Sequence, residues 1–515
     1  MRIVLQPSHR PWSKVSAFLL SFIAAGLLFT TAAQGPITGV DSIRMDELRD
    51  KVTYIASEKF KGRGNGTREL TMAAEYIAGI FEKNGLKPGS GRFFQSFEMY
   101  TSLLGTNNDM RIQGASASEW KLTVRTDFIP ERWSVNGVVS GPMVLVERPG
   151  SNSANLKGKI AVVKEGRGLA DDPEFPENAA TGHSLEAEGA IGVVVVQDPS
   201  DRREGEIAAL AEAFRDDLPT RIVPMSTVDS PEYPKIPVVV VSGDVSKRLL
   251  PLLMNSQNKV EAAITADVNR KTFTTQNVIG LVEGTDPDLK KEVMVLGAHY
   301  DHDGEAYGQI WYGADDNGSG TAALLEIAEA FGIGSMKPAR SVLLCAWAGE
   351  EKGLLGSRYY VSHPLFPLDR TVAMFQMDMI GRNEEHGADE SEGIPEERAS
   401  ENGNTMNVLG SAYSPDLKAI ISRMNDQTGL TLRFRYDFGA QELLQRSDQW
   451  SFLSKRIPAV FFFAGLHPDY HTPRDTAAKI NYAKLEKAAK LVYLAAVDIA
   501  NSPVRPKYIK PANGR

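Results

Sequence analysis

Three consecutive segments decide how this chain folds: EVMVLGAHYDHDG (292–304), YGADDNGSGTAALLEIAEAF (312–331) and SVLLCAWAGEEKGLLGS (341–357). The first and third contain apolar runs of strand length, Val293–Leu296 and Val342–Trp347. The second opens a helical pattern over Thr321–Phe331. Strand, helix and strand in this order predict an α/β fold with a mainly parallel sheet.

Acids and histidines follow the apolar runs where each run ends. Two further runs, in MFQMDMIGR (374–382) and AVFFFAGLHPDYHT (459–472), end in the same way. The side chains concerned are His299, Asp301, Glu350, Glu351, Asp378 and His471. An acidic pair, Asp315-Asp316, also opens the helical pattern. Ligands of open α/β sheets bind outside the carboxyl ends of the strands, so these side chains predict a metal site there.

The predicted ligands can hold two divalent ions. Two histidines supply nitrogen ligands, and three carboxylates supply oxygen ligands and negative charge. One bridging hydroxide would bring the total negative charge into balance with that of the two ions. Two metal ions about 3.5–4 Å apart activate water and stabilise both oxygens of a displacement. Nitrogen and oxygen ligands without sulfur favour zinc, with cobalt or manganese as substitutes.

The acids that neighbour the predicted ligands are expected to have different roles. Adjacent Glu350 and Glu351 cannot easily both bind one ion, so one should coordinate and the other should take a proton from water. Asp301 lies two residues past His299 and is placed to accept the other ring N–H of that histidine. An isolated acid after a strand is usually a solvated loop residue, so the prediction rests on the whole set.

The motifs that carry these residues resemble those of the two-zinc aminopeptidase family. This family includes bacterial leucyl aminopeptidase, yeast vacuolar aminopeptidase Y, glutamate carboxypeptidase and the transferrin receptor ectodomain. The motifs are HYDH (299–302), GADDNGSG (313–320), GEE (349–351), MDMIGR (377–382) and HPDYHT (467–472). The resemblance implies a three-layer α/β/α zinc-peptidase fold with a mainly parallel mixed sheet.

The resemblance also implies a role for each residue. His299 and Asp378 would be the terminal ligands of one zinc ion, and Glu351 and His471 those of the other. Asp315 would bridge both ions, and the Asp315–Asp316 peptide is often cis in this family. Glu350 would be the general base. Tyr470 would donate a hydrogen bond to the oxyanion, as in some relatives, or would simply pack. Spacing alone does not exclude His302 and His467, and the family pattern favours His299 and His471.

The segment 130–268 has a different texture. Short β-branched runs bounded by glycine and proline predict a small β-rich domain inserted into a larger one. It resembles the protease-associated domain that some family members carry. The predicted organisation is a signal peptide (1–33), the N-terminal part of the peptidase domain (34–129), the insert (130–268), the catalytic domain (269–505) and a tail (506–515).

The N-terminus predicts export. Arg2, Arg10 and Lys14 precede the apolar stretch Val15–Phe29, and small residues up to Ala33 complete the pattern of a secretory signal peptide. Cleavage after Ala33 would place the protein in the periplasm or outside the cell, and an uncleaved anchor is the alternative. With a single cysteine in 515 residues, no intrachain disulfide can form.

Composition and charge narrow the range of possible partners and functions. The net charge of -8 and the absence of a basic block exclude a nucleic-acid partner and, beyond the signal peptide, a membrane partner. The predicted function is a zinc-dependent exopeptidase that removes N-terminal residues from peptides. A carboxypeptidase or dipeptidase and a non-catalytic receptor-like protein are the alternatives, and the oligomeric state stays open.

A terminal carboxylate would call for converging arginines. The candidates are scattered along the chain: Arg382, Arg433, Arg435 and Arg446. The acidic stretch 383–404 has no apolar period and predicts a solvated, mobile loop. Its acids could instead help to recognise a free amino group, although plain solvation is the simpler interpretation.

Overall fold

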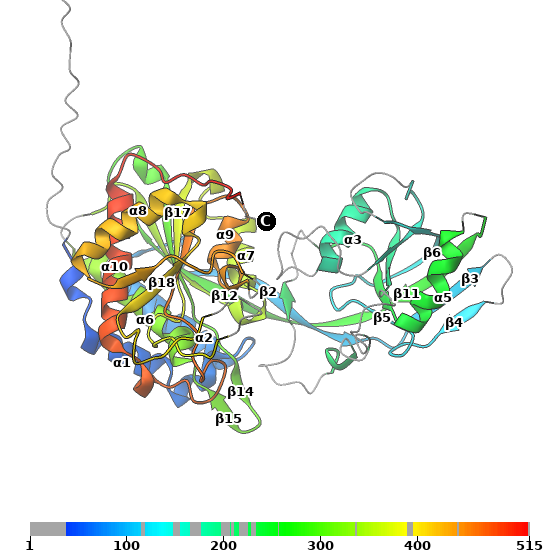
Figure 1. The fold of residues 1–515 in the computed structure, drawn as a ribbon, viewed down its shortest axis with the longest axis horizontal. Coiled ribbons are helices and arrows are strands. Elements are labelled where there is room, and N and C mark those ends of the chain that lie inside the picture. The colour runs from blue at the N-terminus through cyan, green and yellow to red at the C-terminus, as the bar shows by residue number, and fades with distance from the viewer. Residues whose placement is uncertain are drawn as a thin grey trace, which may run out of the picture. The chain divides into compact units, whose positions relative to one another are not determined.

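The computed structural model describes most of the chain (Figure 1). The described residues are 38–114, 119–147, 155–164, 177–196, 207, 211–215, 225–227, 233–255, 257–334, 337–388, 395–439 and 442–512. The predicted signal peptide (1–33) lies outside them. None of the helices within these ranges combines the length and the apolar character that crossing a bilayer requires.

A large mixed sheet forms the centre of the catalytic part. Its strand order is β19-β18-β20-β17-β13-β16-β12-β2-β9, and β1 pairs with β12. The strands are β1 Lys87–Pro88, β2 Phe94–Leu104, β9 Ser226–Thr227, β12 Val268–Val282, β13 Val293–His299, β16 Ser341–Trp347, β17 Thr371–Met377, β18 Thr405–Leu409, β19 Thr431–Arg433 and β20 Ala459–Phe463. The four central strands β20, β17, β13 and β16 are parallel, which confirms the predicted α/β class.

Helices cover both faces of this sheet. They are α1 Met45–Ile55, α2 Arg68–Lys83, α6 Gly320–Ile333, α7 Leu355–Ser362, α8 Pro415–Met424, α9 Gln449–Leu453 and α10 Tyr482–Asn501. Alternate residues of a strand face opposite sides. Met294 and Leu296 of β13 therefore pack with α1, α2, α6, α8 and α10, whereas Val293 and Val295 pack with α7 and α9. The result is the predicted three-layer α/β/α arrangement.

Local sequence signals explain where the helices begin. The Thr67 hydroxyl accepts a hydrogen bond from the Leu70 amide at the start of α2. Asn481 caps α10 in the same way, with its side chain accepting a hydrogen bond from the Lys484 amide. The predicted helix Thr321–Phe331 lies inside α6, whose residues are nearly all buried.

A second sheet lies in the segment between β2 and β12. Its order is β4-β3-β11-β6-β7-β8-β10-β5. The elements are β3 Asp109–Gly114, β4 Trp120–Leu122, β5 Phe128–Pro130, β6 Gly137–Leu145, β7 Ile160–Lys164, α3 Glu177–Ala187, β8 Gly192–Val196, β10 Val238–Val241, α5 Gly243–Met254 and β11 Val260–Ala266. This sheet includes β3 and β4, which precede residue 130, and the domain boundaries stay a prediction.

The single cysteine lies in the middle of β16. Cys345 is completely buried in the cluster that contains Val295, Leu343 and Trp347, and burial raises the pKa of its thiol well above the ordinary value. Burial in an apolar core is what the sequence around Cys345 indicates.

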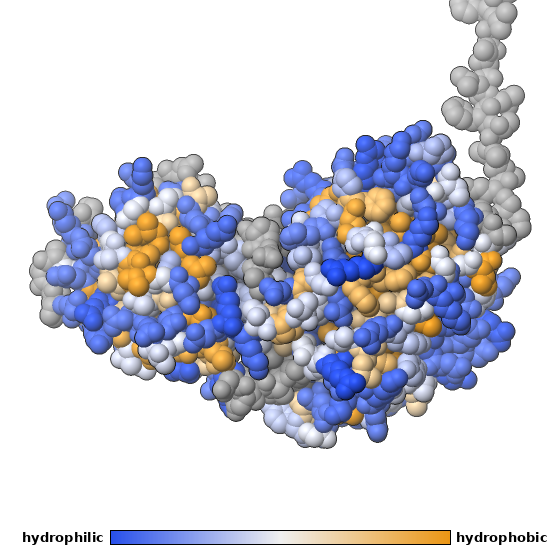
Figure 2. All heavy atoms as spheres, turned by 180° about the vertical axis from the view of Figure 1, so that it is seen from behind, coloured by the Kyte–Doolittle hydropathy of each residue, from blue (hydrophilic) through white to orange (hydrophobic). Residues whose placement is uncertain are grey.

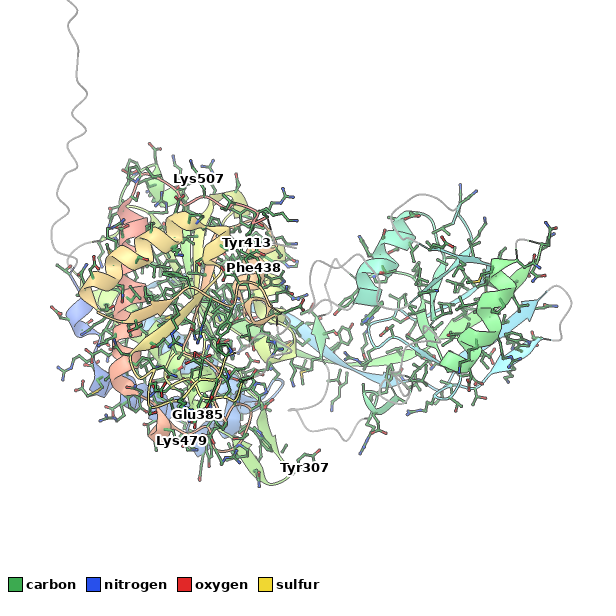
Figure 3. All side chains as sticks on the ribbon, in the orientation of Figure 1. Tyr307, Glu385, Tyr413, Phe438, Lys479 and Lys507 are labelled. Atoms are coloured by element: carbon green, nitrogen blue, oxygen red, sulfur yellow. The ribbon has the colours of Figure 1, made fainter. Side chains whose placement is uncertain are left out.

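The described surface is mostly hydrophilic on the face that Figure 2 shows. A two-stranded sheet, β14 Gly304–Ala306 and β15 Gln309–Trp311, projects beside the catalytic loops. Tyr307 at its tip is 78% exposed and points away from the fold (Figure 3). The hairpin follows directly on the HYDH motif, so its base is part of the surroundings of the site.

Candidate active site

The predicted side chains meet at the carboxyl end of the parallel strands. His299 is the last residue of β13, and Asp378 follows β17. Glu350 and Glu351 lie in a short 3-10 turn, Glu350–Lys352, directly after β16. His471 comes from the loop after β20. Since neighbouring parallel strands end at one edge, residues far apart in sequence lie within a few ångströms of each other.

One carboxylate lies between the two histidines. Asp316 Oδ1 is 3.3 Å from His299 Nε2, and Asp316 Oδ2 is 3.1 Å from His471 Nε2. Each histidine also faces an acid of its own. Asp378 Oδ1 is 3.1 Å from His299 Nε2, and Glu351 Oε2 is 3.2 Å from His471 Nε2. The cluster is thus two histidine–carboxylate pairs joined by Asp316.

The structure puts Asp316, and not the predicted Asp315, in the central position. Asp315 Oδ1 accepts hydrogen bonds from the amides of Gly381 and Arg382, at 2.7 and 3.1 Å. Its Oδ2 lies 3.3 Å from His467 Nε2. These hydrogen bonds to the segment after Asp378 turn the Asp315 carboxylate away from His299 and His471. The cis peptide is correspondingly Asp316–Asn317.

The two histidines that the family pattern does not favour differ in their surroundings. His467 lies against Asp315, outside the cluster. His302, in contrast, is buried, and its Nδ1 is 2.6 Å from Glu351 Oε1. Asp303, the next residue, places Oδ2 3.5 Å from His471 Nδ1. The HYDHD segment therefore contacts both halves of the cluster, which spacing alone does not reveal.

Asp301 holds the turn that carries the two glutamates. Its Oδ1 accepts a hydrogen bond from the Glu350 amide at 3.2 Å, and its Oδ2 accepts one from Asn65 Nδ2 at 2.7 Å. The predicted contact with the ring of His299 is longer, since Nδ1 is 3.8 Å from the carboxylate and 3.2 Å from the backbone carbonyl of Asp301. Asp301 thus supports His299 mainly through its backbone.

Arg63 is a supporting residue that the sequence does not reveal. It is completely buried, and its guanidinium donates to four backbone carbonyls, those of Ile55, Tyr300, Tyr312 and Gly313. Tyr300 belongs to the HYDH motif, Gly313 opens GADDNGSG with Tyr312 directly before it, and Ile55 ends α1, so one side chain ties the N-terminal segment to both motifs. Its partners lie up to 250 residues away along the chain, and no local pattern marks such a contact.

Ser447 fixes the other end of the cluster. Its hydroxyl donates to Asp378 Oδ2 at 2.6 Å, while Asp378 Oδ1 faces His299. Behind it, Gln376 Nε2 donates to the buried Asp448 at 2.9 Å. Both oxygens of Asp378 are therefore held in place, which fixes the direction of the free lone pairs.

The electrostatics of the cluster call for cations. Burial opposes ionisation of His471, yet Glu351 and Asp316 raise its pKa to about 11. Burial also opposes a charge on His299, and Asp378 and Glu350 still raise its pKa well above the ordinary value. Buried carboxylates that outnumber their cationic partners are costly. Groups of nitrogen and oxygen atoms within 4.8 Å of one another, as here, fit divalent metal ions.

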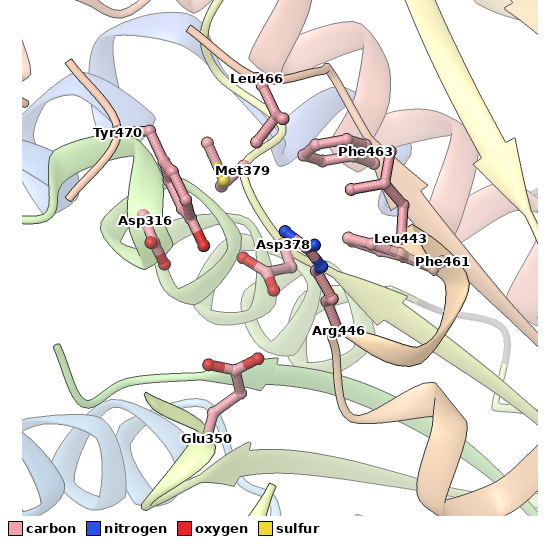
Figure 4. A pocket seen from close by; sticks show the side chains of 10 residues that line it. All are labelled: Asp316, Glu350, Asp378, Met379, Leu443, Arg446, Phe461, Phe463, Leu466 and Tyr470. Carbon is pink, nitrogen blue, oxygen red and sulfur yellow. The ribbon is translucent and has the colours of Figure 1, made fainter. Parts of the chain in front are cut away.

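A pocket opens beside the cluster (Figure 4). It encloses about 380 Å³ of space, its mouth included. The lining residues are Asp316, Glu350, Asp378, Met379, Leu443, Arg446, Phe461, Phe463, Leu466 and Tyr470. Figure 4 shows the Tyr470 hydroxyl pointing toward Asp316 and Asp378. A substrate in this pocket would lie with its reacting bond against the carboxylates and an apolar group against Leu443, Leu466 and the stacked rings of Phe461 and Phe463.

We expect replacement of His302 by glutamine to weaken metal binding at the half of the cluster that holds Glu351. The change removes the 2.6 Å contact that orients this carboxylate, and loss of such outer partners typically costs about 10–100-fold in metal affinity. Competition with a chromogenic chelator measures the effect. The exposed His363, replaced by glutamine, is the matched control and should retain normal affinity. Equal affinity in both variants would contradict the role of His302.

Comparison with known proteins identifies the catalytic part. Residues 277–496 match the sequence profile of Peptidase family M28. That segment is a family M28 peptidase domain. The matched residues include every strand end of the cluster, from β13 to the loop after β20.

Named relatives of the M28 domain extend over more of the chain. Aminopeptidase YwaD of Bacillus subtilis (strain 168) is 27% identical over 70% of this chain and 66% of its own length. Leucine aminopeptidase 2 of Trichophyton rubrum is 25% identical over 72% of this chain and 69% of its own. The chain thus spans about two thirds of each. The structure of a zinc aminopeptidase from Bacillus subtilis aligns with 89% of this chain and 96% of that chain, at 21% identity and a TM-score of 0.44.

Proposed function

We propose that this protein is a zinc-dependent aminopeptidase that releases N-terminal residues from peptides. The observation that carries the proposal is Asp316, one carboxylate shared by two histidines that each face a second acid. The M28 match of residues 277–496 and the aminopeptidase names of the relatives support it. The alternative of a receptor-like protein is disfavoured because no position of the cluster has lost its ligand side chain.

The residues divide into two ligand sets. His299 and Asp378 would hold one zinc ion, Glu351 and His471 the other, and Asp316 would contact both. When bound, zinc supplies Lewis acidity, which makes water a stronger acid and a carbonyl carbon more electrophilic. The histidines would bind zinc as neutral imidazoles and the acids as carboxylates, so binding would release the protons that the histidines otherwise hold.

Glu350 is proposed as the general base. It lines the pocket, next to His299, at 3.8 Å, without a closer histidine of its own. Burial raises the pKa of its carboxyl group well above the ordinary value, so it can hold a proton between two steps. It would take the proton from the attacking water and give it to the amine nitrogen as the C–N bond breaks.

Tyr470 is proposed as the donor to the oxyanion. Burial raises the pKa of its phenol well above the ordinary value, which keeps the hydroxyl protonated and able to donate. Its position in the pocket wall places the hydroxyl on the side of Asp316 and Asp378. A donor that is already oriented stabilises charge as it develops on the carbonyl oxygen.

Two further proposals concern the localisation of the protein and its domain organisation rather than its chemistry. The pattern of residues 1–33 supports export to the periplasm or beyond. The second sheet supports an inserted domain that resembles the protease-associated kind. Neither affects the residues of the cluster.

The test of an aminopeptidase compares two substrates at one pH. Hydrolysis of leucyl p-nitroanilide with a free amine is expected, with little hydrolysis of its N-acetylated form. Carboxylates of the pocket, such as Glu350 and Asp378, can recognise the ammonium, and acetylation removes its charge. Faster cleavage of the acetylated substrate would overturn the proposal in favour of a carboxypeptidase.

A further inference from the structure

Arg446 stands apart from the other arginines that could recognise a carboxylate. Arg382 Nη2 pairs with Asp469 at 3.1 Å, and Arg433 Nη1 pairs with Glu397 at 2.6 Å. Arg435 pairs with Glu397 at 2.8 Å and also with Glu384. The acidic stretch after Arg382 is therefore not simply solvated, because Glu384 and Glu397 are committed to these arginines.

The guanidinium of Arg446 makes no ion pair within 4 Å with any residue that the structure describes. The side chain is exposed and lines the pocket beside the cluster. Figure 4 shows it reaching in from the wall that carries Leu443 and Phe461, toward Asp378. An arginine without an ion-pair partner among the described residues is available to a ligand.

The backbone around Arg446 is well anchored. Its amide donates to the Leu443 carbonyl at 3.2 Å, which closes a short 3-10 turn, Leu443–Gln445. The next residue, Ser447, is held by its hydrogen bond to Asp378. The position of Arg446 is thus fixed relative to the catalytic carboxylates, although the tip of its side chain is free to adjust.

The chemistry around Arg446 is that of a carboxylate site with an apolar approach. The neighbouring walls are Phe461, Phe463 and Leu466, which would contact a hydrocarbon stem. A guanidinium binds a carboxylate through two parallel N–H donors, and it repels ammonium groups. Uncharged apolar side chains alone would suffice for a pocket that accepts leucine, so the arginine adds a further selection.

We propose that Arg446 binds a carboxylate of the substrate. This inference rests on the proposed peptidase function and deepens it. The carboxylate has two possible sources: the side chain of an acidic N-terminal residue, or the free C-terminus of a dipeptide. Both place a negative group a few bonds from the scissile carbonyl, within reach of one pocket.

The experiment measures kcat/KM for matched pairs of substrates that differ by one charge. Glutamyl p-nitroanilide against glutaminyl p-nitroanilide tests the side chain. The dipeptide Leu-Gly against Leu-Gly amide tests the C-terminus. Arg446→Met keeps the length and apolar character of the stem and removes the charge. We expect the acid-to-amide ratio of one pair to fall by roughly tenfold or more in this variant.

The ratios also separate this inference from the proposed function. A variant with a general defect loses activity on both members of a pair, which leaves the ratio unchanged. Arg423→Met, at an exposed position on α8, is the matched control and should keep the ratios of the wild type. If Arg446→Met leaves both ratios unchanged while leucyl p-nitroanilide is cleaved by the wild type, Arg446 binds no substrate carboxylate. Failure of the wild type on every substrate would overturn the peptidase proposal itself.

Discussion

Asp316→Ala is expected to remove more zinc than any other single change in the cluster. The variant loses the carboxylate that contacts both histidines, so two cations would face each other without the negative charge between them. The loss of affinity should exceed the roughly 10–100-fold typical of outer partners. Elemental analysis after dialysis against a weak chelator measures the zinc retained per chain.

Asp315→Ala is the matched control, since it removes the same group from the adjacent position. It leaves the amides of Gly381 and Arg382 without an acceptor, and each buried unpaired group costs about 1–3 kcal/mol of stability. A lower melting temperature with zinc still bound is therefore expected. If the Asp315 variant lost its zinc while the Asp316 variant kept it, the central position would belong to Asp315.

Glu350→Gln is expected to lower kcat by about 10²–10⁴-fold with zinc and fold retained. The amide has the shape of the carboxylate and can hydrogen-bond to water, but it cannot take a proton. The backbone amide of residue 350 keeps its bond to Asp301, so the turn should not rearrange. Zinc content and the melting temperature are measured together with kcat on leucyl p-nitroanilide.

The exposed Glu385, replaced by glutamine, controls for the loss of one negative charge (Figure 3). Its kcat should equal that of the wild type. A Glu350 variant that binds zinc and retains near-normal kcat would remove Glu350 from the proposed mechanism.

The elements of the fold could be predicted because their signals are local. An apolar period and a capping asparagine mark α10 within a few residues, and β-branched runs mark the strands. The strand ends His299, Glu351 and Asp378 follow from the same runs. Parallel strands bring such ends to one edge regardless of the details of packing.

The choice between Asp315 and Asp316 could not be made in this way. Both are aspartates of one loop, and both are buried, at 0% and 3% exposure. Which of them faces the histidines depends on the amides of Gly381 and Arg382, more than sixty residues away. The contact of His302 with Glu351 and the four bonds of Arg63 depend on tertiary structure in the same manner.

For the acids of the loop after Arg382, the expectation from composition differs from the structure. Their composition indicates solvation, yet Glu384 is 2% exposed and bonds to Asn407 and Tyr436 as well as to Arg435. Composition describes the average fate of a charged residue. It does not register an arginine from a segment about fifty residues away, just after β19, that pairs with one of these acids and compensates its buried charge.

The buried thiol of Cys345 is a natural probe of how often the structure around the central strand β16 opens. A thiol reagent can reach it only when the side chains packed on this face of the sheet, among them Tyr360 of α7 and Phe452 of α9, move away from β16. The same strand leads directly into Glu350 and Glu351. The rate of alkylation therefore reports how often the scaffold beneath the catalytic glutamates comes apart, and bound ligands that slow it are ones that stabilise the folded state.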